Sequence, residues 1–465
     1  MRPRNQAARD QLTTALARRA ASSASELAGQ IGVSVPTLHR LLQEHGAAII
    51  AVGKARRRRY ALRRPLRGDL VELPLYAVDA NGRAELVTQL ALIRPQGSCM
   101  DLAGGIWPVP DECRDGWWEG LPYPLYDMRP QGYMGRQQAR AEHRRLGVSA
   151  NPDEWSDEDV AYVLSHVGSD VSGNLILGNP AFERWQSSKL APPEPLKSRA
   201  LARSYARLAE QAIATGVPGS SAAGEFPKFS ALRDLAGSDT PHVLVKFSGA
   251  DGSPAVQRWS DLLVCEHLAL ECAASLPGVT GAHSRIVTQG GRTFLEVERF
   301  DRHGVFGRSP LISLGTLDAA LLGDGGSDWT RLGGLLHHAS LLGADDVQRV
   351  QHLWWFGRLI ANSDMHTGNL SFRPIGSVAP AGTLALSPAY DMLPMLYAPL
   401  PGGEVPTRSF EPPLPLPPQR AVWIAACKVA LGFWARAAKD PRISEGFGRV
   451  CFGNARQLEQ VAGRV

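Results

Sequence analysis

The sequence predicts an α+β protein with a winged helix-turn-helix at its start, then a small β-rich subdomain, then a two-lobed body whose second lobe is largely α-helical. A chain of 465 residues is too long for one simple core. Basic residues gather at one end, and strand-like and helical apolar patterns alternate through the remainder. These observations predict four parts: residues 1–67, 68–150, 151–305 and 306–465.

Charge is distributed unevenly along the chain. The net charge is +5, but residues 1–67 alone carry +11 and residues 68–465 carry −6. A compact basic segment on a mildly acidic body is typical of a part that faces nucleic acid. We therefore expect residues 1–67 to bind double-stranded DNA.

Residues 1–67 also have the pattern of a winged helix-turn-helix. Residues 23–26 (Ser-Ala-Ser-Glu) have capping-box spacing, and Ser34 is expected to cap a third helix with Pro36 in its first turn. Two short strands, 49–52 and 60–62, flank a basic run. In this motif the third helix enters the major groove and the hairpin contacts phosphates. The residues expected to contact DNA are Ser34, Thr37, Arg40, Lys54, Arg56, Arg57, Arg58 and Arg59. A solvated basic arm or a small protein-interaction unit is the alternative.

Residues 68–150 read as β-rich. The strand-like stretches 70–77 and 84–93 flank Asn81-Gly82, a hairpin signal. Residues 183–194 are expected to form a loop or linker, followed by a helix over residues 196–215. No chemistry is assigned to this part of the chain.

The strongest functional signal is Asp364-Met365-His366-Thr367-Gly368-Asn369, which follows an apolar helical stretch. Asp391 comes 22 residues after Asn369, beyond a strand-like stretch. Phosphoryl transfer needs one carboxylate to orient a hydroxyl and accept its proton, and needs amide and carboxylate oxygens to hold Mg²⁺. We therefore predict Asp364 as the base, with Asn369 and Asp391 as Mg²⁺ ligands. The alternative is a turn rich in capping residues.

A kinase also needs a lysine on the nucleotide. Lys246 interrupts the strand-like run 242–247 and is one of only seven lysines. Its ammonium could pair with the ATP phosphates, and Glu266 on the following helix could pair with it. The alternative is a lysine whose head reaches solvent from an edge strand.

Two further segments fit nucleotide binding. Small residues over 218–224 precede Lys228 and would let backbone N–H groups approach phosphates, although neither a Walker A loop nor the protein-kinase glycine loop is present. Residues 295–302 (Leu-Glu-Val-Glu-Arg-Phe-Asp-Arg) lie where a kinase has its hinge. The alternatives are a surface turn and an ordinary amphipathic strand with solvated arginines.

In this order, these pieces resemble the HipA-like serine/threonine kinases, toxin components of bacterial toxin–antitoxin systems. The added N-terminal winged helix makes the chain similar to the YjjJ-type branch. The resemblance rests on residues 221–224, Lys228, Lys246, 297–302, 364–369 and 390–391, with 132–136 similar to a junction in the family.

The resemblance implies a two-lobed kinase that uses ATP and Mg²⁺. It implies that Ser221, or its neighbour Ser220, is autophosphorylated, and that Glu298 and Phe300 bind adenine through backbone groups. The implied ATP-binding residues are Ser221, Ala222, Ala223, Gly224, Lys228, Lys246, Glu298, Phe300 and His366. Family targets include aminoacyl-tRNA synthetases, and an antitoxin and a homodimer are further partners to test. The fused DNA-binding part would repress the chain's own promoter or restrain its own kinase.

Two alternatives remain from the sequence: a small-molecule kinase, and a transcription regulator whose kinase-like body senses a ligand. No apolar run approaches the ~18–20 residues of a membrane span, and the six cysteines lack metal-site spacing. We expect buried thiols and a cytoplasmic protein without a membrane partner.

Overall fold

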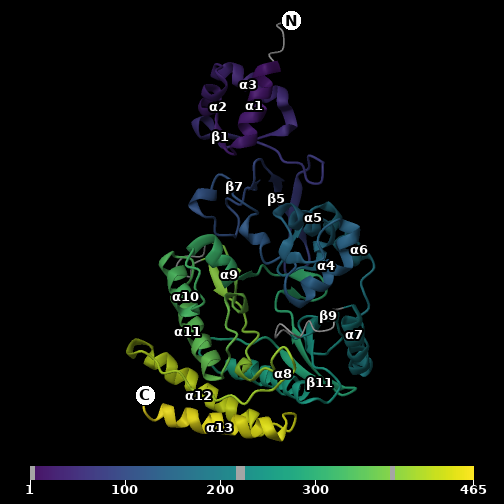
Figure 1. The fold of residues 1–465 in the computed structure, drawn as a ribbon, viewed down its shortest axis with the longest axis vertical. Helices are drawn as coiled ribbons and strands as arrows, with labels where there is room; N and C mark the ends of the chain where they lie inside the picture. Colours follow the sequence, from purple (N-terminus) through teal and green to yellow (C-terminus); the bar gives the residue numbers. More distant parts are fainter. Residues whose placement is uncertain (1–5, 216–225, 377–382) are drawn as a thin grey trace.

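The computed structural model describes residues 6–215, 226–376 and 383–465. The chain forms an elongated stack, with the N-terminal helices at one end and α12 and α13 at the other (Figure 1). Four units follow each other along it: an N-terminal module (6–67), a middle module (68–190), an N-lobe (191–305) and a C-lobe (306–465). No helix in the described part of the chain is long and apolar enough to cross a membrane.

The N-terminal module packs three helices on a small antiparallel sheet. Ser23 caps the second helix in the predicted capping box with Glu26, and Ser34 caps the third. The predicted apolar face of the third helix is buried in the core between the helices. The elements are α1 (Gln6–Arg18), α2 (Ala24–Ile31), α3 (Val35–His45), β1 (Ser22–Ser23), β2 (Ile49–Val52) and β3 (Arg59–Leu62), and the strand order is β1-β3-β2.

The middle module is built on a five-stranded sheet with the order β7-β6-β5-β4-β8. Asn81-Gly82 forms the predicted turn, in which Gly82 has φ +73°. The sheet and its helices comprise β4 (Leu73–Val78), β5 (Ala84–Leu92), β6 (Ser98–Cys99), β7 (Trp117–Trp118), β8 (Leu175–Leu177), α4 (Gly132–Leu146), α5 (Asp157–Val167) and α6 (Asn179–Leu190). Because β8 pairs with β4, residues 151–190 join this sheet and not the N-lobe sheet.

The expectation of a loop over residues 183–194 is wrong for its first part, because α6 extends to Leu190. The stretch itself is polar and gives little helical signal. The helix is held by tertiary packing instead: Ala181 and Trp185 are buried against Val78 and Ile176 of the sheet.

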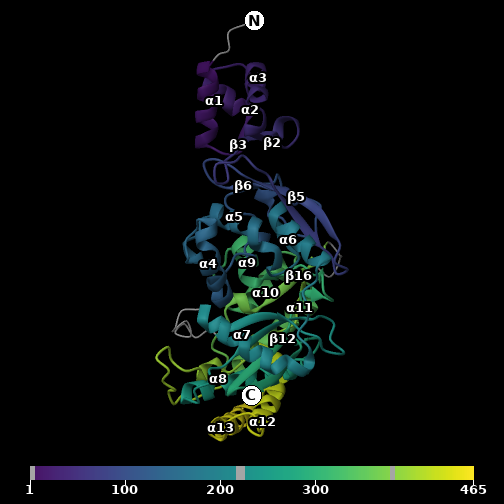
Figure 2. The same cartoon turned by 90° about the vertical axis from the view of Figure 1, so that its right-hand side faces the viewer.

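The N-terminal and middle modules share a core. Ile50 and Ala61 from the first pack with Ala91, Ile93 and Cys99 from the second. Backbone bonds from Arg64 N to Leu92 O (2.9 Å) and from Arg94 N to Leu62 O (2.8 Å) continue the contact. The N-terminal sheet therefore lies directly on β5 and β6, without an intervening linker (Figure 2).

The N-lobe is an antiparallel sheet with the order β11-β12-β10-β9 and a helix on each side. Val243, Val245 and Phe247 pack beneath α7, so the two-residue alternation turns Leu244 and Lys246 to the opposite face. The elements are α7 (Leu201–Thr215), β9 (Lys228–Leu232), β10 (His242–Phe247), α8 (Pro254–Ala273), β11 (Ser284–Gln289) and β12 (Arg292–Glu298).

The C-lobe is mainly helical and shares its core with α8 and the middle module. A short β15-β16-β17 sheet carries the loops that hold the predicted catalytic residues. All six cysteines are free, and all but Cys113 are buried, as predicted. The remaining elements are β13 (Arg302–His303), β14 (Gly307–Arg308), β15 (Ile312–Ser313), α9 (Leu314–Leu317), α10 (Trp329–His338), α11 (Ala344–Leu359), β16 (Ser371–Pro374), β17 (Leu384–Leu386), α12 (Arg420–Ala437) and α13 (Glu445–Ala462).

Candidate active site

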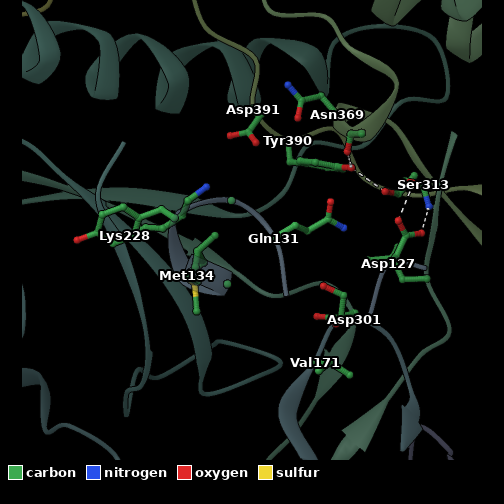
Figure 3. A pocket seen from close by; sticks show the side chains of 18 of the residues that line it. Asp127, Gln131, Met134, Val171, Lys228, Asp301, Ser313, Asn369, Tyr390 and Asp391 are labelled. Carbon is green, nitrogen blue, oxygen red and sulfur yellow. Dashed lines mark hydrogen bonds between the residues drawn. The ribbon is translucent and has the colours of Figure 1, made fainter. Parts of the chain in front are cut away.

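A cavity of about 1210 Å³ lies where the two lobes and the middle module meet. The N-lobe sheet supplies Lys228 and Lys246, and the C-lobe loops supply Asp364, Asn369 and Asp391. Lys228, Asn369 and Asp391 are labelled in Figure 3. The middle module closes a third side with residues 126–138 and 167–172. The cavity is thus large enough for a nucleotide and brings together residues far apart in the sequence.

Asn362 fixes the loop that carries Asp364. This loop leaves the C-terminus of α11, and the buried Asn362 Oδ1 accepts the backbone N–H of Asp364 at 3.0 Å. Its Nδ2 donates to the backbone oxygen of Asp391 at 3.3 Å. One amide side chain therefore sets the spacing of the two acidic loops.

Hydrogen bonds also orient Asn369 and its surroundings. Asn369 Nδ2 donates to Asp364 O at 2.9 Å, which leaves Oδ1 as the oxygen available to a cation. Tyr390 donates its hydroxyl to Gly368 O (2.7 Å) and lies 2.6 Å from Ser371 Oγ. The segment before Asp391 is in this way tied to the segment that carries Asn369.

Gly357 on α11 lies under both acidic loops. A Cβ at this position would lie 2.5 Å from Met365 Sδ and 3.2 Å from Met392 Cε, and both methionines are buried. We expect Gly357→Ala to displace Met365 and Met392, which are the chain neighbours of Asp364 and Asp391. The overpacking should cost about 1–3 kcal/mol of stability, and the displacement should lower activity. Denaturant unfolding and ATP-dependent labelling would measure this.

The matched control is Gly432→Ala on α12, where an added Cβ meets no atom within 4 Å. This exposed helical position should gain about 0.5–1 kcal/mol from the better helix former. Equal effects of the two substitutions on stability would contradict the role assigned to Gly357.

Lys246 is the centre of a buried charge cluster. Its Nζ donates to Glu266 Oε1 (2.7 Å) and Oε2 (2.9 Å), as predicted for this pair, and also contacts Asp391 Oδ1. The side chains of Lys246 and Glu266 are only 5% and 1% exposed. The strand pairing also sets Lys228 directly beside Lys246, so two cations border the cavity.

The cluster has two carboxylates around one ammonium. Burial raises the pKa of Glu266 to about 7, although Lys246 opposes this shift. Burial also disfavours the ionised form of Asp391, but Lys246 and Lys228 outweigh it and lower the pKa of Asp391 to about 2. Of the two carboxylates, the deeper Glu266 has the raised pKa, whereas Asp391 at the cavity wall has the lowered one.

Asp391 also has an unusual backbone. Its φ is +53°, in the left-handed region that non-glycine residues rarely adopt. The neighbouring hydrogen bonds of Tyr390 and Asn362 hold it there. Strain of this kind persists where the surrounding structure imposes it, and it is concentrated at functional sites.

The predicted hinge borders the same cavity. The N–H groups of Glu298 and Arg299 donate to His283 O (2.8 Å) and His242 O (3.0 Å). No hydrogen bond between described residues uses the N–H of Phe300. The Phe300 ring lies 5.7 Å from that of Tyr390, which connects the hinge to the Asp391 loop.

Residues 295–298 belong to β12, but the alternative that Arg299 and Arg302 are solvated is wrong, because Arg302 is buried and the side chain of Arg299 is 16% exposed. Arg302 is 2% exposed and donates to Asp170 Oδ1 and Gly173 O, each at 2.8 Å. Arg299 donates to Asp170 Oδ1 at 3.1 Å and to Asp301 Oδ2 at 2.9 Å. This cluster attaches the hinge to the middle module, and local periodicity could not show a partner so distant in sequence.

The oxygen set fits Mg²⁺ held jointly with phosphates. Asn369 Oδ1 and the carboxylate of Asp391 are hard ligands on one wall of the cavity. No cluster of three or more acidic, histidine or cysteine ligands occurs within residues 6–215, 226–376 and 383–465. Two protein donors would suffice for Mg²⁺, which commonly binds one or two carboxylates together with substrate oxygens.

The cavity brings together most of the predicted site residues. These are Lys228, Lys246, Glu298, Phe300, Asp364, His366, Asn369 and Asp391. Ser220, Ser221, Ala222, Ala223 and Gly224 lie outside the described residues. Sequence reasoning missed Asn362 and the wall formed by residues 126–138. Asn362 could have been found, because Asn two residues before Asp364 is an Asx-turn signal.

Comparison with known proteins identifies the family. A family model described as the YjjJ-like toxin middle domain matches residues 70–186, and one described as the HipA-like C-terminal domain matches residues 220–429. Toxin YjjJ of Escherichia coli (strain K12) is 36% identical over 444 residues, which cover 95% of this chain and 96% of that protein. The chain belongs to the YjjJ family of HipA-like toxins.

The fold has a counterpart among solved structures. HipA from the Shewanella oneidensis MR-1 complex with HipB and operator DNA superposes with a TM-score of 0.53 at 17% identity. The match covers 84% of this chain and 97% of that one. The predicted resemblance to HipA-like proteins is thus confirmed at the level of family and fold, while the YjjJ-like middle domain accounts for the module that walls the cavity.

Proposed function

We propose that this protein is an ATP-dependent serine/threonine protein kinase of HipA type. The proposal rests above all on one observation: Asp364, Asn369, Asp391 and Lys246 line one cavity with the hinge residues Glu298 and Phe300. Membership of a HipA-like toxin family supports it.

In this proposal each residue has one role. Asp364, oriented through the amide of Asn362, accepts the proton of the attacking hydroxyl. Lys246, held by Glu266, pairs with phosphate oxygens. The backbone groups of Glu298 and Phe300 bind adenine. Mg²⁺ at Asn369 and Asp391 would neutralise charge on the transferred group.

We further propose Ser221 as the autophosphorylated residue and a protein, such as an aminoacyl-tRNA synthetase, as the substrate. A phosphate on Ser221 would add about −1.5 to −2 charge to the segment proposed to bind the phosphates of ATP. The test is ATP-dependent phosphoproteomics of cells expressing the wild type or Asp364→Ala. Labelling of Ser221 and of a target only with the wild type would support the kinase, and DNA binding without any labelling would favour a regulator with a sensing body.

We propose that the N-terminal module is a winged helix-turn-helix that binds double-stranded DNA. Thr37 and Arg40 lie on α3, and the exposed Lys54, Arg57, Arg58 and Arg59 lie around the β2–β3 hairpin. Ser34 bonds Thr37, and Arg59 donates to Ala21 O at 3.1 Å. The side chain of Arg56 is outside the described residues. In the Shewanella complex HipA occurs with HipB and operator DNA. Here the fused module would serve autorepression or self-restraint, with or without an antitoxin.

The hairpin prediction can be tested by salt dependence. Lys54→Ala with Arg57→Ala should weaken DNA binding and reduce the slope of log K against log salt by about 2, since each lost phosphate contact removes ~0.9. Fluorescence anisotropy with duplex DNA from the chain's own promoter would measure it. Arg449→Ala, on α13 at the other end of the molecule, should leave the slope unchanged. An unchanged slope in the double variant would contradict the assignment.

A further inference from the structure

A second cavity, of about 300 Å³, lies beside the first, between α6 and the paired strands β9 and β10. We call it the α6 cavity. Its wall includes Arg184 and Trp185 of α6, Val305, and three arginines from the segment after β12: Arg299, Arg302 and Arg308. Ser169, Asp170, Ser230 and Arg299 border both cavities.

Positive charge exceeds negative charge around the α6 cavity. Four arginines line it, whereas Asp170 is the single carboxylate in its wall. Asp170 and the adjacent Asp301 are both taken by Arg299 and Arg302. Among the described residues, no carboxylate lies within ion-pair distance of Arg184 or Arg308. The excess falls in a body whose sequence after residue 67 is net negative.

Arg308 is a buried cation that no carboxylate of the described residues approaches within ion-pair distance, although Asp170 and Asp301 lie near enough to favour its charge. It is 5% exposed, and its Nη2 donates to Ser169 O at 2.6 Å. Among the described residues, Nη1 of Arg308 has no hydrogen-bond partner, and neither has Nε of the nearby Arg302. Its Cζ lies 6.0 Å from the ring centre of Trp185. Burial and the nearby Arg302 lower the pKa of Arg308 to about 9. An unpaired guanidinium in such a place is costly, so it points to an anion that is normally bound.

We propose that the α6 cavity binds a phosphate group, as inorganic phosphate or as a small phosphomonoester, between Arg308 and Arg184. Guanidinium groups match the geometry of phosphate oxygens and can donate two parallel hydrogen bonds. A dianion would offset the two arginines that lack carboxylate partners. A cavity of about 300 Å³ is large enough for a phosphate with a small substituent. This site adjoins the proposed ATP site, and the two share four bordering residues, but phosphate binding there does not depend on kinase activity.

Thermal unfolding of the full chain with inorganic phosphate, against chloride at equal ionic strength, tests the site. At about ten times Kd, phosphate should raise the Tm of the wild type by roughly 1–2 °C. Arg308→Met should abolish this rise without lowering Tm in phosphate-free buffer, because it removes an uncompensated charge. Arg184→Ala, on the exposed surface of α6, should lower the affinity for phosphate by at least about tenfold.

Two controls locate the effect. Arg114→Ala, an exposed arginine of the middle module, and Lys228→Ala, in the active-site cavity, should both keep the phosphate shift. Comparing glycerol phosphate with inorganic phosphate by calorimetry distinguishes the two sources, since the true ligand binds more tightly. The proposal would be overturned if phosphate did not raise the Tm of the wild type. It would also be overturned if phosphate raised the Tm of Arg308→Met and of Arg184→Ala by as much as it raises that of the wild type.

Discussion

Replacing Asp364 by asparagine is expected to lower the rate of phosphoryl transfer by about 10²–10⁴-fold. Asparagine keeps the shape of the side chain but cannot accept the proton of the attacking hydroxyl. Asp364 is exposed in the cavity, and its backbone is held by Asn362, so the loop should keep its conformation. ATP affinity and Tm should therefore stay close to those of the wild type. Single-turnover labelling with radioactive ATP would measure the rate.

The neighbouring exposed serine gives a matched control. Ser363→Ala changes one side chain in the same loop and should leave the rate unchanged, because no step of the proposed reaction uses this hydroxyl. If Asp364→Asn labelled at the wild-type rate, Asp364 would not be the base of the reaction. A parallel fall in Tm would show instead that the loop had lost its structure.

Replacing Lys246 by methionine should affect both folding and activity. It leaves Glu266, which is 1% exposed, and Asp391 without their shared ammonium. Breaking a buried ion pair in this way costs about 3–5 kcal/mol, and the phosphates of ATP would lose a partner. Denaturant unfolding and nucleotide titration would measure the two effects. Lys428→Met, at an exposed position of α12, should change neither.

The stability loss of Lys246→Met should depend on pH. Burial raises the pKa of Glu266 to about 7 from its ordinary value of 4.5. A carboxyl shifted upward contributes stability that is complete below its unfolded pKa and is lost as pH rises through its folded pKa. In Lys246→Met, which lacks the ammonium, the upward shift of the Glu266 pKa is larger than in the wild type. The Tm difference between the variant and the wild type should therefore become smaller as the pH falls toward 5. The double variant Lys246→Met/Glu266→Gln should recover stability but not labelling. A difference independent of pH would contradict the buried-carboxylate explanation.

The parts of this molecule with local signals could be predicted from the sequence. The capping box at Ser23, the Asn81-Gly82 turn and the strand with Lys246 each depend on residues a few positions apart. The Asp364–Asn369 segment could also be recognised, because the candidate base and the candidate amide ligand lie five positions apart in one loop. The Lys246–Glu266 pair followed from the order of strand and helix.

Contacts between distant segments could not be predicted. Asp127 accepts the N–H of Ser313 at 2.6 Å across 186 positions, and no periodicity marks it. The same holds for Arg302 on Gly173 and for the packing that makes α6 a helix. These contacts place the middle module against the cavity, so the loops that carry Asp364 and Asp391 could be identified from the sequence, but the wall opposite them could not. The pairing of β8 with β4, which joins Leu175–Leu177 to the sheet of the middle module, is another such contact.

Because the N-terminal and middle modules share a core, the position of the cavity relative to the N-terminal module is fixed. The middle module packs against the sheet of the N-terminal module at one end and forms a wall of the cavity at the other. The proposed DNA site and the cavity therefore cannot move independently, as they would on a flexible linker. If the N-terminal module docks on a duplex, the mouth of the cavity is held at a fixed distance and angle from it. A hydroxyl-bearing protein bound to the adjacent DNA would then meet the cavity at a high effective concentration. The position of such a protein on the DNA, rather than a sequence motif around its hydroxyl, would then determine whether it is a substrate.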